Sequence, residues 1–178
     1  MSDMQQEASI GMPEQPVMPQ ENDLEDTATD AGVGSQTIEQ RRAAAILTCV
    51  HALPENNDLR KEYRRLVETL PAMTLTNGLG QVLAYLESRA ARDRGETGAA
   101  ARSDATGRVI HDLTHLLVNV RGLYAEQGPY VDQNGFLLQC VINGNREHLR
   151  RATDEALAVL NWWTKFVRAF LPKPDGES

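Results

Sequence analysis

The chain has 178 residues, of which 41% are hydrophobic and 24% are charged, and it carries a net charge of −7. This length and composition suffice for one globular domain with a modest core. No apolar run reaches the ~18 residues that a membrane span requires, and the N-terminus lacks the basic and apolar regions of a secretion signal, so we expect a cytoplasmic protein without membrane association.

Residues 1–36 differ from the rest of the chain in charge. They contain eight acidic residues and no lysine or arginine, whereas residues 37–178 hold all 18 basic residues against 17 acidic ones. The segment also has three prolines, three glycines and one leucine, so it cannot bury enough apolar surface to offset the entropy cost of folding. We predict a disordered acidic tail over 1–36, a helical domain over 37–172 and a short C-terminal tail over 173–178.

The first two expected helices are marked by capping and proline signals. Thr37 followed by Gln40 resembles a capping box, which opens a helix that stops before Pro54. A second helix is expected from about Asn57 to Leu70, where Pro71 should end it. The apolar positions of both helices recur at helical spacing and are expected in the core: Ile46, Leu47, Val50, Leu53, Leu59, Tyr63, Leu66, Val67 and Leu70.

The stretch LPAMTLTNGLGQVLAYL, residues 70–86, combines a helical pattern with poor helix formers. Asn77, Gly78 and Gly80 interrupt the apolar spacing, and each glycine costs ~1 kcal/mol relative to alanine. One explanation is a small, uncharged strip that lets another helix or a subunit approach closely. The other is a local loop that starts the helix late, with Asn77 as its N-cap. We assign a candidate subunit contact to Asn77, Gly78, Gly80 and Gln81.

The rest of the chain continues as helices. The third helix should reach about Arg94 and give way to a loop rich in glycine and alanine over 94–107. FLLQCVI (136–142) is predicted to be a short buried helix, and Asn145 caps a last helix that ends near Leu171. A fourth helix precedes these and is expected to end near the QGPY turn (127–130). It has one apolar face, made of Val109, Leu113, Leu116, Val120 and Leu123 or Tyr124. The predicted fold class is all-α, a compact bundle of about five to six helices.

The last helix has two apolar faces. Trp163 lies on one of them, while Trp162 and Phe166 project from a different side. Either the helix is central in the bundle, or its second face meets another subunit. Trp162 and Phe166 are therefore also candidate subunit-interface residues.

No catalytic, cofactor or metal site is predicted. HDLTH (111–115) spaces His111 and His115 as in metalloproteases, but it carries aspartate where the general base is glutamate, and no third ligand is evident. Nucleophile-elbow, P-loop and dinucleotide-binding motifs are missing. Asp154 and Glu155 are expected on a solvated helix face. The two cysteines lie in apolar helical segments without a CxxC spacing, so buried free thiols are expected.

Basic residues gather in three helical patches, and those of the second helix are expected to dominate its exposed face. Phosphate contacts need only positive charge at tolerant spacing, so these patches are candidates for RNA binding. The alternative is a solvated face with local ion pairs, such as Arg64 with Glu68. Arg42 falls on the apolar face of its helix, where it either extends to solvent or reaches a partner. The candidate RNA-binding residues are Arg41, Arg42, Arg60, Lys61, Arg64, Arg65, Arg146, Arg150 and Arg151.

Two motifs carry a resemblance to a known family. LPAMTLTNGLGQVLAYL (70–86) and TDEALAVLNWWTKFVRAF (153–170) together resemble the small helical subunit of the type III-B CRISPR effector, the Cmr complex. In that family an NGL-G-Q segment precedes a C-terminal helix with an EAL-x-x-L-x-W pattern. The sequence departs from the pattern at Tyr85, where Phe is expected, and at Val167, where a small residue is expected. The resemblance covers about residues 37–171.

The resemblance implies a non-catalytic subunit without cofactors. Members of the family stack along a ribonucleoprotein that serves antiviral defence, and they help to line the path of the target RNA. The expected partners are the backbone subunits and the large subunit of the complex, the guide and target RNA within it, and neighbouring copies of the chain. The alternative is a helical protein–protein adaptor that binds through Trp162 and Phe166 and has no nucleic-acid role.

Overall fold

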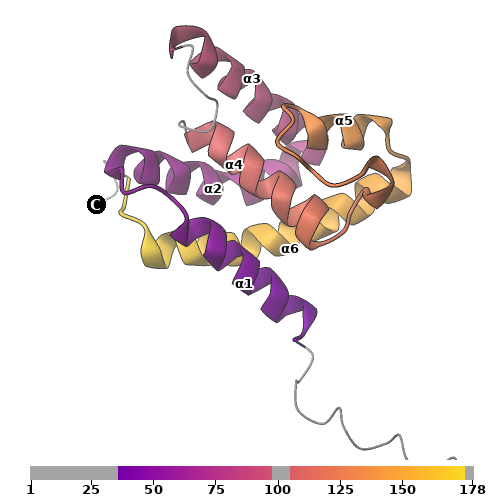
Figure 1. Cartoon of the computed structure of the whole chain (residues 1–178), viewed down its shortest axis with the longest axis horizontal. Coiled ribbons are helices and arrows are strands. Elements are labelled where there is room, and N and C mark those ends of the chain that lie inside the picture. The colour runs from indigo at the N-terminus through magenta and orange to yellow at the C-terminus, as the bar shows by residue number, and fades with distance from the viewer. Residues whose placement is uncertain (1–35, 98–104, 175–178) are drawn as a thin grey trace, which may run out of the picture. The chain divides into compact units, whose positions relative to one another are not determined.

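The computed structural model describes residues 36–97 and 105–174. A π-helical turn, His115–Val120, and a 3-10 turn, Ala125–Gln127, accompany the α-helices. The six α-helices (Figure 1) are α1 (Ile38–His51), α2 (Asn57–Asn77), α3 (Leu79–Thr97), α4 (Ala105–Thr114), α5 (Phe136–Asn143) and α6 (Arg146–Phe170). The described ranges contain no strand, and the predicted all-α bundle of five to six helices is confirmed. None of these helices has the length and apolar composition of a membrane span.

The predicted tails and the central loop fall largely outside the described residues. Of the acidic segment 1–36, the structure describes only Gln36, and of the C-terminal tail it leaves out 175–178. The predicted loop 94–107 is shorter than expected, because α3 and α4 occupy both of its ends. Only 98–104 remains between the two helices, and it lies outside the described residues.

Capping residues set the starts of α1, α2 and α6, close to the predicted positions. The Thr37 hydroxyl accepts from the Gln40 amide at 3.2 Å, and the Gln40 side chain accepts from the Thr37 amide at 2.8 Å, which completes the predicted capping box. The Asn56 side chain accepts from the Asp58 amide at 3.0 Å at the start of α2. The predicted cap of α6 is confirmed, since the Asn145 side chain accepts from the His148 amide in the first turn of that helix.

The prediction that Pro71 ends the second helix is wrong. The helix α2 runs through Pro71 to Asn77, and the chain turns at Gly78, which has φ +81°. A proline inside a helix removes one backbone hydrogen bond. Leu70 and Thr74, on either side of it, are 1% and 2% exposed, so core packing of this last part of α2 outweighs that loss.

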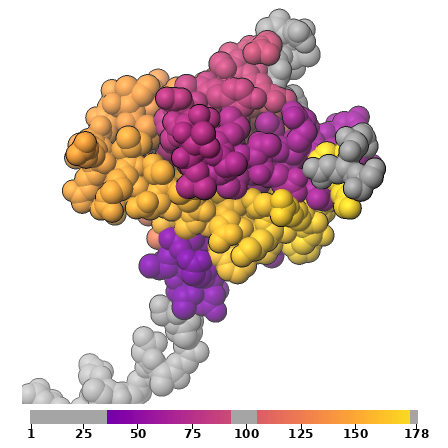
Figure 2. All heavy atoms as spheres, turned by 180° about the vertical axis from the view of Figure 1, so that it is seen from behind, coloured from indigo at the N-terminus to yellow at the C-terminus, as the bar shows by residue number. Residues whose placement is uncertain are grey.

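The helix α6 is the centre of the core. It packs against α1, α2, α3 and α5, and Figure 1 shows it running beneath α4 while α1 crosses it. Figure 2, the view from behind, shows α6 in yellow along the lower side of α2 and α3. Trp163 on α6 is fully buried, and its ring meets the buried Tyr63 ring of α2 edge to face, with the centroids 5.8 Å apart. Such a pair adds to the free energy gained from burying both rings.

The helix that begins with α4 changes its period at His115. In the following π turn, where backbone hydrogen bonds span five residues instead of four, the three consecutive residues Leu116, Leu117 and Val118 are buried. The prediction of one regular helix that ends near the QGPY turn, with Leu123 or Tyr124 on its apolar face, is therefore wrong, because the period changes at His115 and the π turn ends at Val120. The face formed by the α4 residues Val109 and Leu113 is buried as expected. Beyond the turn the chain reverses, and Tyr124 enters the core.

Both cysteines are free and buried, as predicted. Burial, together with the negative charge of Asp112, raises the pKa of the Cys49 thiol to about 12. Burial also raises the pKa of Cys140. Both thiols therefore stay protonated at neutral pH, which makes them unreactive.

Candidate nucleic-acid interface

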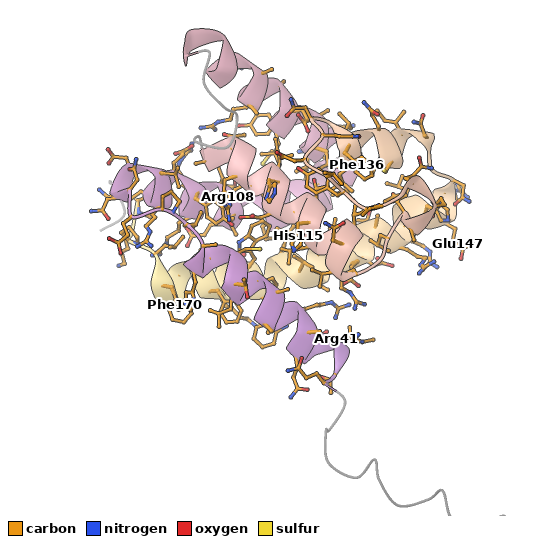
Figure 3. The ribbon with its side chains drawn as sticks, viewed as in Figure 1. Arg41, Arg108, His115, Phe136, Glu147 and Phe170 are labelled. Carbon is orange, nitrogen blue, oxygen red and sulfur yellow. The ribbon has the colours of Figure 1, made fainter. Side chains whose placement is uncertain are left out.

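Exposed arginines lie in the first turns of α1 and of α6. Arg42, the neighbour of Arg41, forms an ion pair with Glu155 of α6, which lies about one turn beyond Arg151. Figure 3 labels Arg41 on α1 and Glu147 in the first turn of α6. The N-terminus of a helix is itself weakly positive, which adds to the charge of the side chains. We call four exposed residues the α1/α6 basic surface: Arg41, Arg146, Arg150 and Arg151.

Arg42 does not extend into solvent from the apolar face of α1. Its guanidinium donates two hydrogen bonds of 2.6 Å to the Glu155 carboxylate, and it also pairs with Glu39 of its own helix. Arg121, just after the π turn, donates to the same carboxylate at 2.6 Å. Glu155 thus joins α1 and the π turn to α6 through two arginines. Of the two alternatives for Arg42, extension into solvent or contact with a partner, the structure supports the second, and the partner is Glu155 of the same chain.

The expectation that Glu155 is a solvated surface residue is wrong. Its side chain is only 12% exposed, against 68% for the neighbouring Asp154. Burial raises the pKa of the Glu155 carboxyl, but the hydrogen bonds and charges of Arg42 and Arg121 outweigh burial, and the net pKa is lowered. Glu155 is therefore an ionised carboxylate that stabilises the contact between α1 and α6.

The basic residues of α2 are largely engaged in contacts within the chain. Arg60 donates to the backbone carbonyls of Pro54 and Leu53 at 3.1 and 3.3 Å, so it braces the turn between α1 and α2. Arg65 pairs with Glu62 through two hydrogen bonds of 2.8 and 2.6 Å. The structure therefore supports the local ion-pair alternative for much of this patch.

Arg64 is a clear departure from the predicted exposed face of the second helix. Its side chain is 8% exposed, and it donates to Glu68 at 3.2 Å and to the Leu171 carbonyl at 3.0 Å. The same Glu68 accepts from Arg168 of α6 at 2.9 Å. Arg64 therefore closes the end of α6 against α2, because helical ends leave carbonyl groups that need donors.

The nine predicted RNA-binding residues do not form one face. The α1/α6 basic surface includes the first turns of α6, whereas Arg64 binds the carbonyl of Leu171, the residue that follows the last turn of α6. At ~1.5 Å per residue, Arg151 lies roughly 30 Å and Arg146 roughly 38 Å along α6 from Leu171. A single patch that uses both groups would have to span the length of this helix.

The predicted subunit-interface residues Trp162 and Phe166 lie over the seam between α6 and α1. The Trp162 ring nitrogen donates to the Glu39 carboxylate of α1 at 2.7 Å, and the centroids of the Trp162 and Phe166 rings lie 5.7 Å apart. Phe170 continues the row and meets the His51 ring of α1 at 5.4 Å. Packing against α1 thus accounts for part of the second apolar face. A contact of Trp162 and Phe166 with another subunit stays a prediction.

The NGLG segment is a break between two helices. Gly78 separates α2, which ends at Asn77, from α3, which begins at Leu79. Residues 70–86 therefore do not form one continuous helix, and the third helix begins late, as the second explanation predicted. Asn77 belongs to α2 and does not cap α3. A Cβ atom on Gly80 would lie 3.5 Å from Val141 Cγ1 of α5, so this position faces a helix of the same chain. Asn77 and Gln81 remain exposed.

The histidines of HDLTH are bound to neighbouring side chains. His111 Nδ1 lies 3.2 Å from Asp112 Oδ1, and His115 Nδ1 lies 3.2 Å from the amide nitrogen of Asn119. Within residues 36–97 and 105–174, no three histidine, cysteine or acidic side chains come together as a possible metal site. Metal binding through this motif is not proposed.

Sequence reasoning missed the carboxylate in the same motif. Asp112 is 1% exposed, and it accepts from the Tyr63 hydroxyl at 2.7 Å and from Arg108 at 3.1 Å. Burial and this carboxylate raise the pKa of Tyr63 well above its usual value. The placement of Asp112 between apolar residues of one helix was a signal for such a buried site. With its partners present, Asp112 ties α2 to α4 and needs no ligand.

The chain matches a known protein family over nearly all of the described structure. The model of the CRISPR-associated protein family Cas_Cmr5 matches residues 38–170, from the first residue of α1 to the last of α6. The X-ray crystal structure of a CRISPR-associated Cmr5 family protein from Thermus thermophilus is similar, with a TM-score of 0.52 at 22% sequence identity. That match covers 77% of this chain and 100% of the Thermus chain, and it supports the shared fold.

Proposed function

The chain belongs to the Cmr5 family of CRISPR-associated proteins, and from this membership we propose that it is the non-catalytic small subunit that stacks along the Cmr ribonucleoprotein and helps to hold target RNA. The family match confirms the resemblance carried by the two sequence motifs, and it makes the chain a subunit of the CRISPR Cmr complex. The contact with RNA, the stacking and the absence of catalysis are the proposed part.

The observation that supports RNA contact is the α1/α6 basic surface. Its four arginines are exposed, and the pairing of Arg150 with Asp154 at 3.7 Å joins two side chains that are 69% and 68% exposed. An exposed pair of this kind contributes little and gives way to a phosphate easily. Phosphate contacts of this sort are weak, independent of sequence and sensitive to salt.

The observation that supports stacking is the exposed face of α3. Gln81, Ala84 and Ser88 are small or uncharged and exposed, and Tyr85 beside them is 43% exposed. Such a strip allows another backbone to approach without desolvating a charge. We propose that this face contacts a neighbouring subunit. The substitution Ala84→Arg should then lower the amount of this chain that copurifies with the complex, whereas Leu75→Arg at an exposed position of α2 should not.

RNA contact can be tested by comparing two quadruple glutamine variants within the assembled complex. The first replaces the α1/α6 basic surface, and the second removes the same charge from exposed positions elsewhere, namely Arg65, Arg92, Lys165 and Lys173. We expect the first variant to bind matched target RNA roughly tenfold more weakly at physiological salt. Its plot of log affinity against log salt should also be shallower by ~0.7 for each phosphate that the variant no longer neutralises.

The outcomes separate the proposed function from its alternatives. Equal losses in both variants would show a general charge effect and contradict the assignment of the surface. Unchanged RNA affinity in the first variant, together with loss of incorporation in Trp162→Ala, would favour the protein–protein adaptor that binds through Trp162 and Phe166. Continued target cleavage by complexes that contain either variant is expected, because the proposed role is non-catalytic.

A further inference from the structure

A hollow beside Tyr124 adjoins the α1/α6 basic surface. Two cavities of about 90 and about 230 Å³ share Tyr124, Glu126 and His148 in their walls. Arg151 completes the smaller cavity, and Cys140 at the end of α5 lines the larger one. A single water needs only ~15 Å³ of such space, so the larger cavity has room for a ligand well above the size of water.

The Tyr124 side chain forms part of the wall of this hollow. The residue is 6% exposed, and its hydroxyl is enclosed by the protein, with no hydrogen-bond partner among the described residues. A Cβ atom on Gly144 would come within 3.3 Å of Tyr124 Cε1 and 2.9 Å of the Cys140 carbonyl oxygen. The glycine thus lets the tyrosine ring lie directly against the end of α5.

The walls of the hollow combine an aromatic face with groups for hydrogen bonding. The Tyr124 and His148 rings stand edge to face with centroids 5.9 Å apart, and the His148 side chain is 41% exposed. The Glu126 carboxylate, 3.8 Å from His148 Nδ1, can accept hydrogen bonds, and Arg151 supplies a positive charge. Aromatic stacking, hydrogen bonds to a base edge and a nearby cation are the means by which proteins hold an unpaired nucleotide.

We propose that this hollow receives one unpaired nucleotide of the RNA strand that crosses the α1/α6 basic surface. The base stacks on His148, its edge meets Glu126, and Arg151 binds the adjoining phosphate. The inference rests on the proposed function, because it assumes RNA at this surface. It adds a contact with a base to contacts with phosphates alone.

Two single substitutions test the site in the assembled complex. His148→Ala should weaken binding of matched target RNA roughly tenfold, since it removes a stacking surface. Tyr124→Phe removes only the enclosed hydroxyl and should leave the RNA affinity unchanged. It should not lower the melting temperature, because the hydroxyl has no partner to lose among the described residues. His51→Ala, which removes a similar ring contact at the other end of α6, is the control and should leave the affinity unchanged.

A scan of the RNA provides a readout that a structural role would not alter. Target RNAs that each carry one abasic nucleotide should bind the wild-type complex normally, except at the position seated in the hollow. At that position the abasic RNA should lose affinity with wild type but lose little more with His148→Ala, because both changes remove the same stacking contact. Adenosine and guanosine monophosphate, titrated onto the full chain, test whether a free nucleotide is held as well as a strand.

The results separate failure of this inference from failure of the proposed function. If the quadruple variant of the basic surface weakens RNA binding but His148→Ala does not, the nucleotide site is wrong and the RNA role stands. Loss of monophosphate binding in His148→Ala, with unchanged RNA affinity, would identify a free-nucleotide site and overturn the proposal for the strand. If none of the variants alters RNA affinity, both proposals fail.

Discussion

The arginines of α2 and those of the α1/α6 basic surface look alike in the sequence but have different surroundings in the structure. On α2, Arg65 pairs with Glu62, and Arg64 is buried against Glu68 and the Leu171 carbonyl. At the start of α6, Arg146 and Arg151 are exposed. The comparison teaches that nearby carboxylates and carbonyls, rather than the density of basic residues, decide which arginines are available to a ligand.

The difference arises from what each helix provides near its arginines. Glu62 and Glu68 stand three and four residues from the arginines they bind, which is the spacing of contacts along one helix face. α2 also lies beside the C-terminal end of α6, where carbonyl groups need donors. The first turn of α6 presents amide groups instead, which attract anions. The arginines at this end of α6 therefore have no helix-end carbonyl groups to bind, which leaves them available to a ligand.

The largest effect that would test this comparison is expected for Arg64→Ala. The substitution leaves Glu68 with only the exposed Arg168 as a partner among the described residues and leaves the Leu171 carbonyl without its buried donor. We expect a loss of about 3 kcal/mol in the free energy of unfolding, because removing one member of a buried ion pair leaves the other charge without adequate compensation. Urea unfolding monitored by circular dichroism measures it. Arg65→Ala is the matched control, and it should change stability by less than ~0.5 kcal/mol.

A smaller loss is expected for Glu155→Gln in the N-terminal half of α6. Arg42 and Arg121 are 13% and 17% exposed, and both would lose their charged partner. Glutamine can still accept a hydrogen bond, so we expect a loss of about 2 kcal/mol in the free energy of unfolding. Asp154→Asn, one residue away and exposed, should have almost no effect. Similar results for the two variants would contradict the distinction between engaged and available charges.

Acid should weaken the same contact by a smaller amount. The pKa of Glu155 is lowered in the folded chain, so its contribution to stability is present above the ordinary value of 4.5 and is lost as pH falls through the folded pKa. The stability difference between wild type and Glu155→Gln should therefore stay constant from pH 7 to about pH 5 and shrink below pH 4.5. Unfolding curves at a series of pH values measure this difference. A constant difference down to about pH 3 would show that Glu155 is not ionised in the way the geometry indicates.

Local signals predicted the helices well, whereas contacts between distant residues were not predictable. Thr37 and Asn145 fixed the starts of two helices because caps act within one turn. Pro71 led to a wrong prediction of the end of α2. Its local signal is the loss of one backbone hydrogen bond, whereas the packing that outweighs this loss comes from other helices. Glu155 was misread for a related reason. Its arginine partners come from positions 113 and 34 residues earlier in the chain, and no pattern within α6 reveals them.

The basic residues of the candidate site were predictable from the sequence, but the hollow beside them was not. The basic turn at the start of α6 was visible in the sequence, and its arginines are exposed. The hollow at Tyr124 was not, because it depends on the π turn and on the reversal at Tyr124, which has φ +59°. Few residues other than glycine adopt that conformation, so sequence patterns give little warning of it. The family resemblance identified the complex and left these side-chain contacts open.

The smallest effect on stability is expected for Arg146→Gln, and it gives the comparison its sharpest test. Arg146 is exposed in the first turn of α6, where positive charge opposes the helix dipole, so its removal should change the free energy of unfolding by less than ~0.5 kcal/mol and can raise it. In the assembled complex the same change should make the salt dependence of RNA binding shallower by ~0.7, which corresponds to one phosphate fewer. Arg65→Gln should leave that slope unchanged, because Glu62 already neutralises Arg65. If Arg65→Gln reduced the slope and Arg146→Gln did not, RNA would lie along α2, and the α2 arginines would have to exchange their carboxylates for phosphates on binding.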